Sequence, residues 1–389
     1  MAKNISSRSA LRLIVIAQFL GTSLWFAGNA AAPEWELILA EKDITAMITS
    51  MVQFGFISGT LLYALGSIPD RYSPSKVFLY SAVLASVSNF CIFIFPLSYP
   101  SVLVFRFLVG FFLAGIYPVG MKIAADYFEK GLGSALGFLV GALVLGTAFP
   151  FLVKALELRF SWESILLSTS GLALIGGFLI GFGVPDGPFR KVNPKLDLSL
   201  FPKFNRNKDL KGAASGYFGH MWELYTFWAF LPTVIFYLTD QNISSTRQAL
   251  WTFLIIGIGG ISCALGGIIA HKSSSQKVAL VSLAGSGLCG LFFLSGVNFP
   301  DMLILPFLLI WGILVTADSP QFSTLVAQSV EAENRGTALT LVNCLGFGLT
   351  IVSIQFTQFL SRFVEPHIYM GLLSVGPLLG VLLFRFFRK

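Results

Sequence analysis

The chain has 389 residues, of which 55% are hydrophobic and only 12% are charged, with a net charge of +7. Soluble domains usually carry about 25% charged residues, so this composition excludes a water-soluble globular protein. Apolar stretches of about 20 residues, long enough to cross a bilayer as helices, alternate with short polar connections. Strand-like alternation is missing, which disfavours an outer-membrane barrel. We therefore expect an all-α membrane protein.

About twelve transmembrane helices are predicted, in chain order. The candidate spans are 11–32, 44–68, 77–97, 101–125, 132–155, 164–184, 212–238, 251–270, 278–296, 302–326, 337–360 and 367–387. The first is too long for the core of a signal peptide, and no small-residue cleavage site precedes a soluble domain. We expect this span to be retained in the mature protein.

Lysine and arginine residues are concentrated on one side of these spans. The opposite side has only Lys42, Lys154, Arg159, Arg247 and Arg362. The positive-inside rule then places both termini and the central loop in the cytoplasm. The expected location is the inner membrane of a bacterial cell, and the lipid bilayer accounts for the positive charge without a nucleic-acid partner.

The sequence repeats itself at an offset of about half its length. At offset 201 the stretch 66–77 falls on 267–278, at 202 Gly110 and Pro118 fall on Gly312 and Pro320, and at 203 the stretch 133–136 falls on 336–339. Three matches in order indicate a duplication. We predict pseudo-symmetric six-helix halves at 1–184 and 212–389, joined by a cytoplasmic linker at 185–211.

The loop after the second span carries Gly66, Asp70, Arg71 and Lys76. These residues resemble the loop signature of the major facilitator superfamily, and 267–278 holds a weaker copy of it. Arg106 with Gly110 resembles the fourth-helix pattern of that family. The resemblance covers essentially the whole chain. It implies the two-bundle major facilitator fold and secondary transport by alternating access.

The signature loop is predicted to act as a gate. Gly66 would permit close approach of helices, and Asp126 would form an ion pair with Arg71. The resemblance implies that Asp70 lies at the N-terminal end of the eleventh span, near Gly336, in the outward-facing state. The alternative is a basic loop that only sets the orientation of the chain.

The resemblance also implies that spans 1, 4, 7 and 10 line a central cavity. Polar and aromatic residues recur at helical spacing in these same spans, which independently favours a polar face on each. The predicted substrate-binding residues are Gln18, Trp25, Asn29, Arg106, Tyr117, Trp222, Glu223, Tyr225, Trp228, Asp318 and Gln321. The aromatic residues among them could stack on an organic solute or a cation.

The ionisable residues of these spans are candidates for proton coupling. An acid within an apolar span costs several kcal/mol unless it is paired, neutralised or hydrated. Glu223 with His220 one turn earlier is predicted to share a proton, with Asp318 as a further site; the alternative is a fixed hydrogen-bonded pair. Pro320 predicts a bend beside Asp318. Arg106 could attract a substrate anion, pair with an internal acid, or snorkel to the membrane surface.

The predicted function is proton-coupled symport of a small organic solute by a monomer without metal or cofactor. A drug or metabolite exporter is an alternative, although Gly146 and Pro150 match the Gly-Pro signature of antiporters poorly. A membrane-embedded enzyme would need a metal cluster, a nucleophile with its base, or a nucleotide loop, none of which the sequence contains. Two homologous halves favour alternating access over the continuous pore of a channel.

Overall fold

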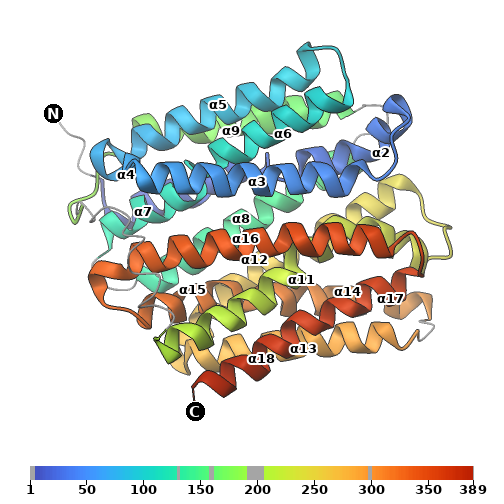
Figure 1. Cartoon of the computed structure of the whole chain (residues 1–389). Helices are drawn as coiled ribbons and strands as arrows, with labels where there is room; N and C mark the ends of the chain where they lie inside the picture. The colour runs from blue at the N-terminus through green and yellow to red at the C-terminus, as the bar shows by residue number, and fades with distance from the viewer. Residues whose placement is uncertain (1–4, 129–131, 157–161, 191–205, 297–299, 389) are drawn as a thin grey trace. The chain divides into compact units, whose positions relative to one another are not determined.

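A computed structural model describes residues 5–128, 132–156, 162–190, 206–296 and 300–388 (Figure 1). The described residues form helices and contain no strand, which confirms the predicted all-α fold. The middle of the predicted linker, 191–205, lies outside the described residues, and so does Arg159. The chain separates into two compact units, Met1–Lys195 and Leu196–Lys389, and the boundary between them falls within the predicted linker.

The first unit is a bundle of membrane-length helices. Its helices are α1 (Ser7–Thr22), α2 (Ala27–Leu39), α3 (Ile44–Leu65), α4 (Ile68–Arg71), α5 (Pro74–Ile94), α6 (Tyr99–Leu113), α7 (Tyr117–Tyr127), α8 (Leu132–Leu156) and α9 (Trp162–Gly183). Helices α1 and α2 are two parts of one span, as are α6 and α7.

The second unit repeats this arrangement. Its helices are α11 (Lys208–Leu238), α12 (Ser245–Lys272), α13 (Ser275–Leu294), α14 (Asp301–Ala317), α15 (Ser319–Gln328), the short η2 (Ala332–Asn334), α16 (Arg335–Leu360), α17 (Pro366–Gly371), η3 (Leu372–Ser374) and α18 (Val375–Phe387). Helices α14 and α15 form one span, and α17 to α18 form another.

The helix starts reproduce the sequence repeat. Ile44 of α3 and Ser245 of α12 are 201 residues apart, and Leu132 of α8 and Arg335 of α16 are 203 apart. The starts of α6 and α14 are separated by 202 residues. Corresponding helices therefore begin at the offsets at which the sequence matches, which confirms the two pseudo-symmetric halves.

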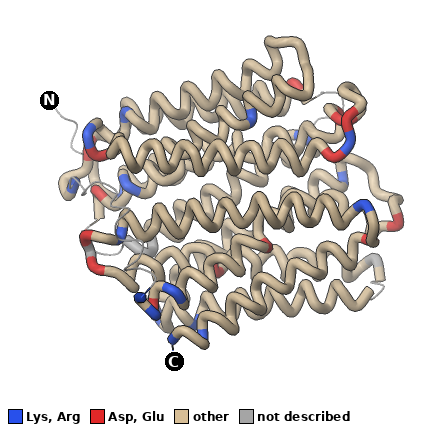
Figure 2. The backbone as a smooth tube through the Cα atoms, in the orientation of Figure 1, with Lys and Arg blue, Asp and Glu red and all other residues tan. Residues whose placement is uncertain are grey.

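Eleven helical stretches within the described residues are long and apolar enough to cross a membrane. Helix α11 is not among them, because His220, Trp222 and Glu223 lower its hydropathy. The eleven stretches and α11 together make up the twelve-helix pattern predicted from the sequence. The positions of Lys, Arg, Asp and Glu gather at the ends of the helices and are sparse along their middles (Figure 2).

Close helix contacts in the first unit depend on glycine. An added Cβ on Gly55 or Gly59 of α3 would overlap the backbone of α6, and one on Gly110 of α6 would overlap the backbone of α3. Gly66, for which we predicted this role, ends α3 instead, and the atoms nearest to its added Cβ belong to its own turn. The close approach therefore occurs along α3 and α6, before the loop begins.

Breaks in three spans place backbone polar groups inside the bundles. Pro118 and Pro320 stand at the second positions of α7 and α15, just after the breaks. A proline has no N–H to donate to the carbonyl four residues earlier, so the helix is interrupted there. The break between α1 and α2 contains no proline. It is bridged by the short-range bond from the Trp25 N–H to the Thr22 carbonyl.

Candidate functional site

Arg106 of α6 lies completely buried at the break between α1 and α2. Its guanidinium donates to the backbone carbonyls of Leu24, at 3.0 Å, and of Trp25. These carbonyls are turned out of regular helix by the break and need donors. The snorkelling that we considered for Arg106 is therefore wrong, because the side chain points into the bundle.

Asn89 of α5 fixes the other side of this guanidinium. Its side-chain oxygen accepts a hydrogen bond from Arg106 at 3.1 Å, while its amide nitrogen donates to the Leu166 carbonyl and to two hydroxyls of α9. Gly28 leaves the space that the arginine fills, since an added Cβ there would lie 2.9 Å from Arg106 Nε. Arg106 thus links α2, α5 and α6.

The other predicted substrate residues of the first unit lie along α1, α2 and α7. Asn29 is buried and donates to the Thr49 hydroxyl at 2.7 Å, and the Trp25 ring packs on Phe56 with centroids 4.9 Å apart. Gln18 is buried against Gly120 of α7. Tyr117 is half-buried at the start of α7. Trp25 and Asn29 form one group, and Gln18 lies elsewhere, between α1 and α7.

Asp318 occupies the break between α14 and α15 in the second unit. One of its oxygens lies 2.8 Å from His220 Nδ1, and both side chains are completely buried. Pro320 leaves the Thr316 carbonyl without its helical donor, and the Cys263 thiol donates to that carbonyl at 3.2 Å. The predicted bend beside Asp318 is thus present, and His220 is the residue that faces the acid.

Glu223 has a separate set of partners. The Trp311 indole donates to one of its oxygens at 2.7 Å, and the Ser286 hydroxyl donates to the other at 2.8 Å. We predicted that Glu223 and His220 share a proton directly, and this is wrong in the structure, where His220 pairs with Asp318. The two side chains are three residues apart on α11, and Glu223 reaches Trp311 of α14 and Ser286 of α13, whereas His220 reaches Asp318 at the end of α14.

The aromatic residues of α11 do not form one surface. Tyr225 is buried and packs on Trp228 and on Phe347 of α16, with both centroid distances 5.3 Å. Trp222 is only half-buried and contacts the exposed Phe356. Gln321 is buried in the first turn of α15. Trp222 therefore lies toward the periphery of its unit, and Tyr225 and Trp228 toward the interior.

The signature loop of the first unit forms a different ion pair from the predicted one. Asp70 pairs with Lys122 of α7 at 2.8 Å, and each side chain is 14% exposed. Among the described residues Arg71 and Asp126 form no ion pair, and Arg71 is exposed. Lys76 instead donates to the Gly181 carbonyl at 3.0 Å and lies over the Phe182 ring.

The segment after α9 packs against this loop. Arg190 pairs with Asp186 and also donates to the backbone carbonyls of Asp70 and Tyr72. The N–H of Phe189 donates to the backbone carbonyl of Asp126, at 3.0 Å. The start of the predicted linker is thus attached to the predicted gate, which the sequence had not indicated.

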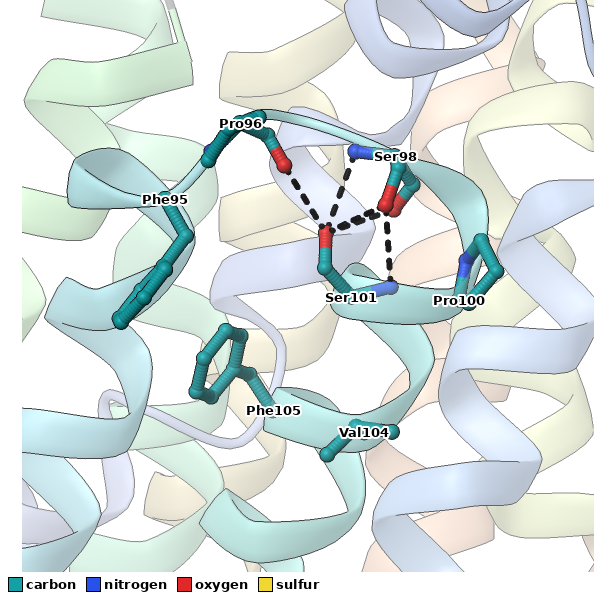
Figure 3. A pocket seen from close by; sticks show the side chains of 7 residues that line it. All are labelled: Phe95, Pro96, Ser98, Pro100, Ser101, Val104 and Phe105. Carbon is teal, nitrogen blue, oxygen red and sulfur yellow. Dashed lines mark hydrogen bonds between the residues drawn. The ribbon is translucent and has the colours of Figure 1, made fainter.

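An open apolar groove of about 460 Å³ lies where α5 is followed by α6 (Figure 3). Its lining is Phe95, Pro96, Ser98, Pro100, Ser101, Val104 and Phe105. Ser98 and Ser101 bond reciprocally and cap α6, so their polar groups are satisfied locally. None of the predicted site residues lines this groove, which has no charged side chain.

Several partners of the site residues carry no sequence pattern. Lys122, Ser286 and Asn89 lie in helices that hold other polar residues as well, so composition alone does not single them out. Gln53 of α3 is also completely buried, and none of its side-chain atoms has a hydrogen-bond partner in the described part of the chain. A search for isolated amides within spans would have found Asn89 and Gln53, although not the partners of Asn89.

Two duplicated bundles of membrane-length helices, with helix breaks beside buried ionisable groups, define the class of secondary transporters. The family model of the Major Facilitator Superfamily matches residues 14–354, and the chain belongs to this family. No curated protein sequence matches the chain.

Proposed function

We propose that this protein is a proton-coupled symporter that moves a small organic solute across the inner membrane by alternating access. The observation that carries the proposal is the complete burial of His220, Glu223 and Asp318 within one unit. Ionisable groups at membrane depth are costly, and they are typical of proton relays and substrate pathways. The family membership supports secondary transport as the coarser function.

The Asp318–His220 pair is the principal coupling site in this proposal. A proton bound to the pair changes its net charge, and the energetic cost of burying that charge changes with it. The pair lies at a helix break, where a small change in backbone geometry moves the acid relative to its partner. Loading and release of the proton can then be linked to the conformation of α14 and α15.

Glu223 is the second proton-binding group. Its indole and hydroxyl partners are neutral, so they compensate an ionised carboxylate less well than a cation would. A neutral, protonated Glu223 is the form that fits this apolar surrounding best. The acid could then deliver its proton when water or solute reaches it.

Arg106 has a positioning role in the proposal rather than contact with a substrate anion. The two terminal nitrogens of its guanidinium are already bonded to two carbonyls and to Asn89, and Nε alone has no partner among the described residues. We assign substrate contact in the first unit to the side chains around Trp25, Asn29 and Gln18.

The signature loop is the proposed gate, with Asp70 and Lys122 as its ion pair. Contact of Asp70 with the start of α16 belongs to the proposed outward-facing state. We further propose cytoplasmic termini and a monomeric carrier. Cysteine accessibility on either side of right-side-out vesicles tests the orientation, with a cysteine introduced at the exposed Arg12.

Infrared spectroscopy of the reconstituted protein tests the proton sites without a known substrate. Titration with pH should change the carboxyl C=O stretching band, and Glu223→Gln and Asp318→Asn should each remove part of that change. Ser58→Ala on α3 is the control, because Ser58 bonds only to its own helix. A titration that is identical in the wild type and in both variants would refute the proposed role of Glu223 and Asp318 in proton coupling.

Counterflow tests the transport itself. A thermal-shift panel of amino acids, organic acids, amines, sugars and drugs identifies a solute that stabilises the folded protein. Proteoliposomes preloaded with that solute should then take up the labelled form faster than empty ones. Uptake that preloading does not accelerate would indicate a channel instead of a carrier.

A further inference from the structure

Two buried side-chain amides on facing helices of the first unit leave polar atoms without hydrogen-bond partners. They are Asn29 of α2 and Gln53 of α3, 5% and 0% exposed. Neither atom of the Gln53 amide has a partner among the described residues, and neither does the oxygen of Asn29. Burial of an unpaired amide costs about 1–3 kcal/mol, so two of them in one place require an explanation.

The direction in which Asn29 points follows from its one bond. The Thr49 hydroxyl donates its hydrogen to the Thr45 carbonyl at 2.6 Å, so its oxygen can only accept from Asn29. The Asn29 nitrogen must therefore face Thr49, at 2.7 Å. The Asn29 oxygen is then left as an acceptor without a donor.

Gln53 lies one helical turn after Thr49, on the same face of α3. Phe56 follows Gln53 by three residues on α3, and its ring packs on Trp25 of the α1–α2 break, with centroids 4.9 Å apart. The unpaired amide groups are thus bordered by Thr49 on one side and by an aromatic pair on the other. We call Trp25, Asn29, Thr49, Gln53 and Phe56 the amide cluster.

The unmet hydrogen-bonding capacity defines a ligand. The oxygens of Asn29 and Gln53 each need a donor, and the Gln53 nitrogen needs an acceptor. A hydroxyl group supplies a donor and an acceptor together, and neighbouring hydroxyls supply several. No carboxylate or ammonium group bonds to these amides in the described part of the chain. The charge that borders the cluster is the Arg106 guanidinium, and two of its nitrogens are already bonded to the Leu24 and Trp25 carbonyls and to Asn89.

We propose that the amide cluster binds a neutral polyhydroxylated solute, a sugar or a polyol, through Asn29 and Gln53, with the apolar face of the solute against Trp25. This inference rests on the proposed transport function and names the substrate class for it. Because both amides are buried, the solute reaches them only when the helices around them open, as alternating access would provide.

Equilibrium binding tests the inference separately from transport. Purified full-length protein in detergent is heated with D-glucose, D-xylose or D-mannitol, and with succinate, putrescine and glycine betaine as the ionic classes. We expect a sugar or polyol to raise the melting temperature in a saturable manner, and the ionic solutes to leave it unchanged. Stabilisation by the ionic solutes alone would overturn the inference, and so would the absence of any stabilisation.

Gln53→Leu is the decisive variant, with Ser58→Ala on the same helix as its control. Loss of two neutral hydrogen bonds should weaken binding about tenfold or more in Gln53→Leu and leave it unchanged in Ser58→Ala. Without ligand, Gln53→Leu should be at least as stable as the wild type, because an unpaired buried amide has been removed. Equal affinity in Gln53→Leu and the wild type would contradict the inference.

Analogues of the bound sugar give the same answer without any mutation. Monodeoxy forms that lack a hydroxyl contacting the cluster should bind the wild type about tenfold more weakly, and equal binding of every monodeoxy form would reject the site. The two proposals fail differently. Counterflow of an ionic solute without sugar binding would refute sugar binding by the amide cluster and leave the transport proposal intact. Sugar binding without counterflow would refute the transport proposal and leave sugar binding by the amide cluster intact.

Discussion

Arg106→Met is expected to destabilise the first unit strongly. The substitution keeps much of the volume of the side chain but removes the guanidinium donors to the Leu24 and Trp25 carbonyls and to the oxygen of Asn89, which leaves Leu24 only the long bond from the Ala27 N–H, at 3.4 Å. These three acceptors remain buried. The Trp25 carbonyl in the α1–α2 break would then lose its guanidinium donor at a depth where lipid cannot replace it.

The size of the effect follows from those three bonds. A hydrogen bond to a charged group contributes about 1.5–3 kcal/mol, and an acceptor left unpaired in the interior costs about 1–3 kcal/mol. Breaking a buried charged network at one partner typically costs about 3–5 kcal/mol, and we expect this range for Arg106→Met. Arg106→Lys keeps the charge and can reach only part of the set, so about half of that loss is expected.

Unfolding in mixed detergent micelles, followed by tryptophan fluorescence, measures the free energy of unfolding. Arg12→Met is the control, since Arg12 is exposed on α1, and it should change that free energy by less than about 0.5 kcal/mol. A loss below about 1 kcal/mol in Arg106→Met would refute the reasoning. The carbonyls would then have other donors, and Arg106 would again be a candidate for substrate binding.

Three further predictions use the same preparations. Gly110→Ala should cost about 1–3 kcal/mol because its methyl group overlaps the backbone of α3, whereas Gly171→Ala meets nothing and should be nearly neutral; equal effects would contradict the packing. A double-mutant cycle of Asp70→Asn and Lys122→Met should give a coupling of about 0.5–1 kcal/mol, and additive effects would exclude a stabilising ion pair. Trp311→Phe should shift the infrared C=O band of its protonated carboxyl partner to higher frequency, and an unchanged band would mean that the indole bond is not made.

The sequence was sufficient for the helices and for the duplication. The length of an apolar run and the thickness of a bilayer determine a span, and both are local quantities. The interruption beside Asp318 was equally accessible, because Pro320 removes a specific backbone donor two residues away. The start of α16 could likewise be placed from the start of α8 by the repeat alone.

Side-chain partners required the packed structure. Helical spacing correctly places His220 and Glu223 on neighbouring turns of α11, and that spacing suggested a shared proton. The direction of each side chain decides the outcome, and His220 turns to Asp318 whereas Glu223 turns to Trp311 and Ser286. Spacing along one helix does not contain that information.

Arg106 shows the same limit over a longer distance. Its charge suggested a substrate anion, a partner acid or the membrane surface, since those are the usual destinations of a cation in a span. The structure gives it backbone carbonyls of another helix. These carbonyls need a donor because the helix is broken between α1 and α2, and no proline marks that break in the sequence.

The positions of the breaks in the fourth and tenth spans reflect the duplication of the chain. Ile116 in the first break and Asp318 in the second are 202 residues apart, which makes them counterparts in the duplication. The interruption of the helix is therefore inherited by both copies, whereas the charge belongs to one. A backbone that is already irregular tolerates an acid more readily than an intact helix does, so descendants of one ancestral bundle could diverge into a neutral copy and a titrating copy by a change at a single position.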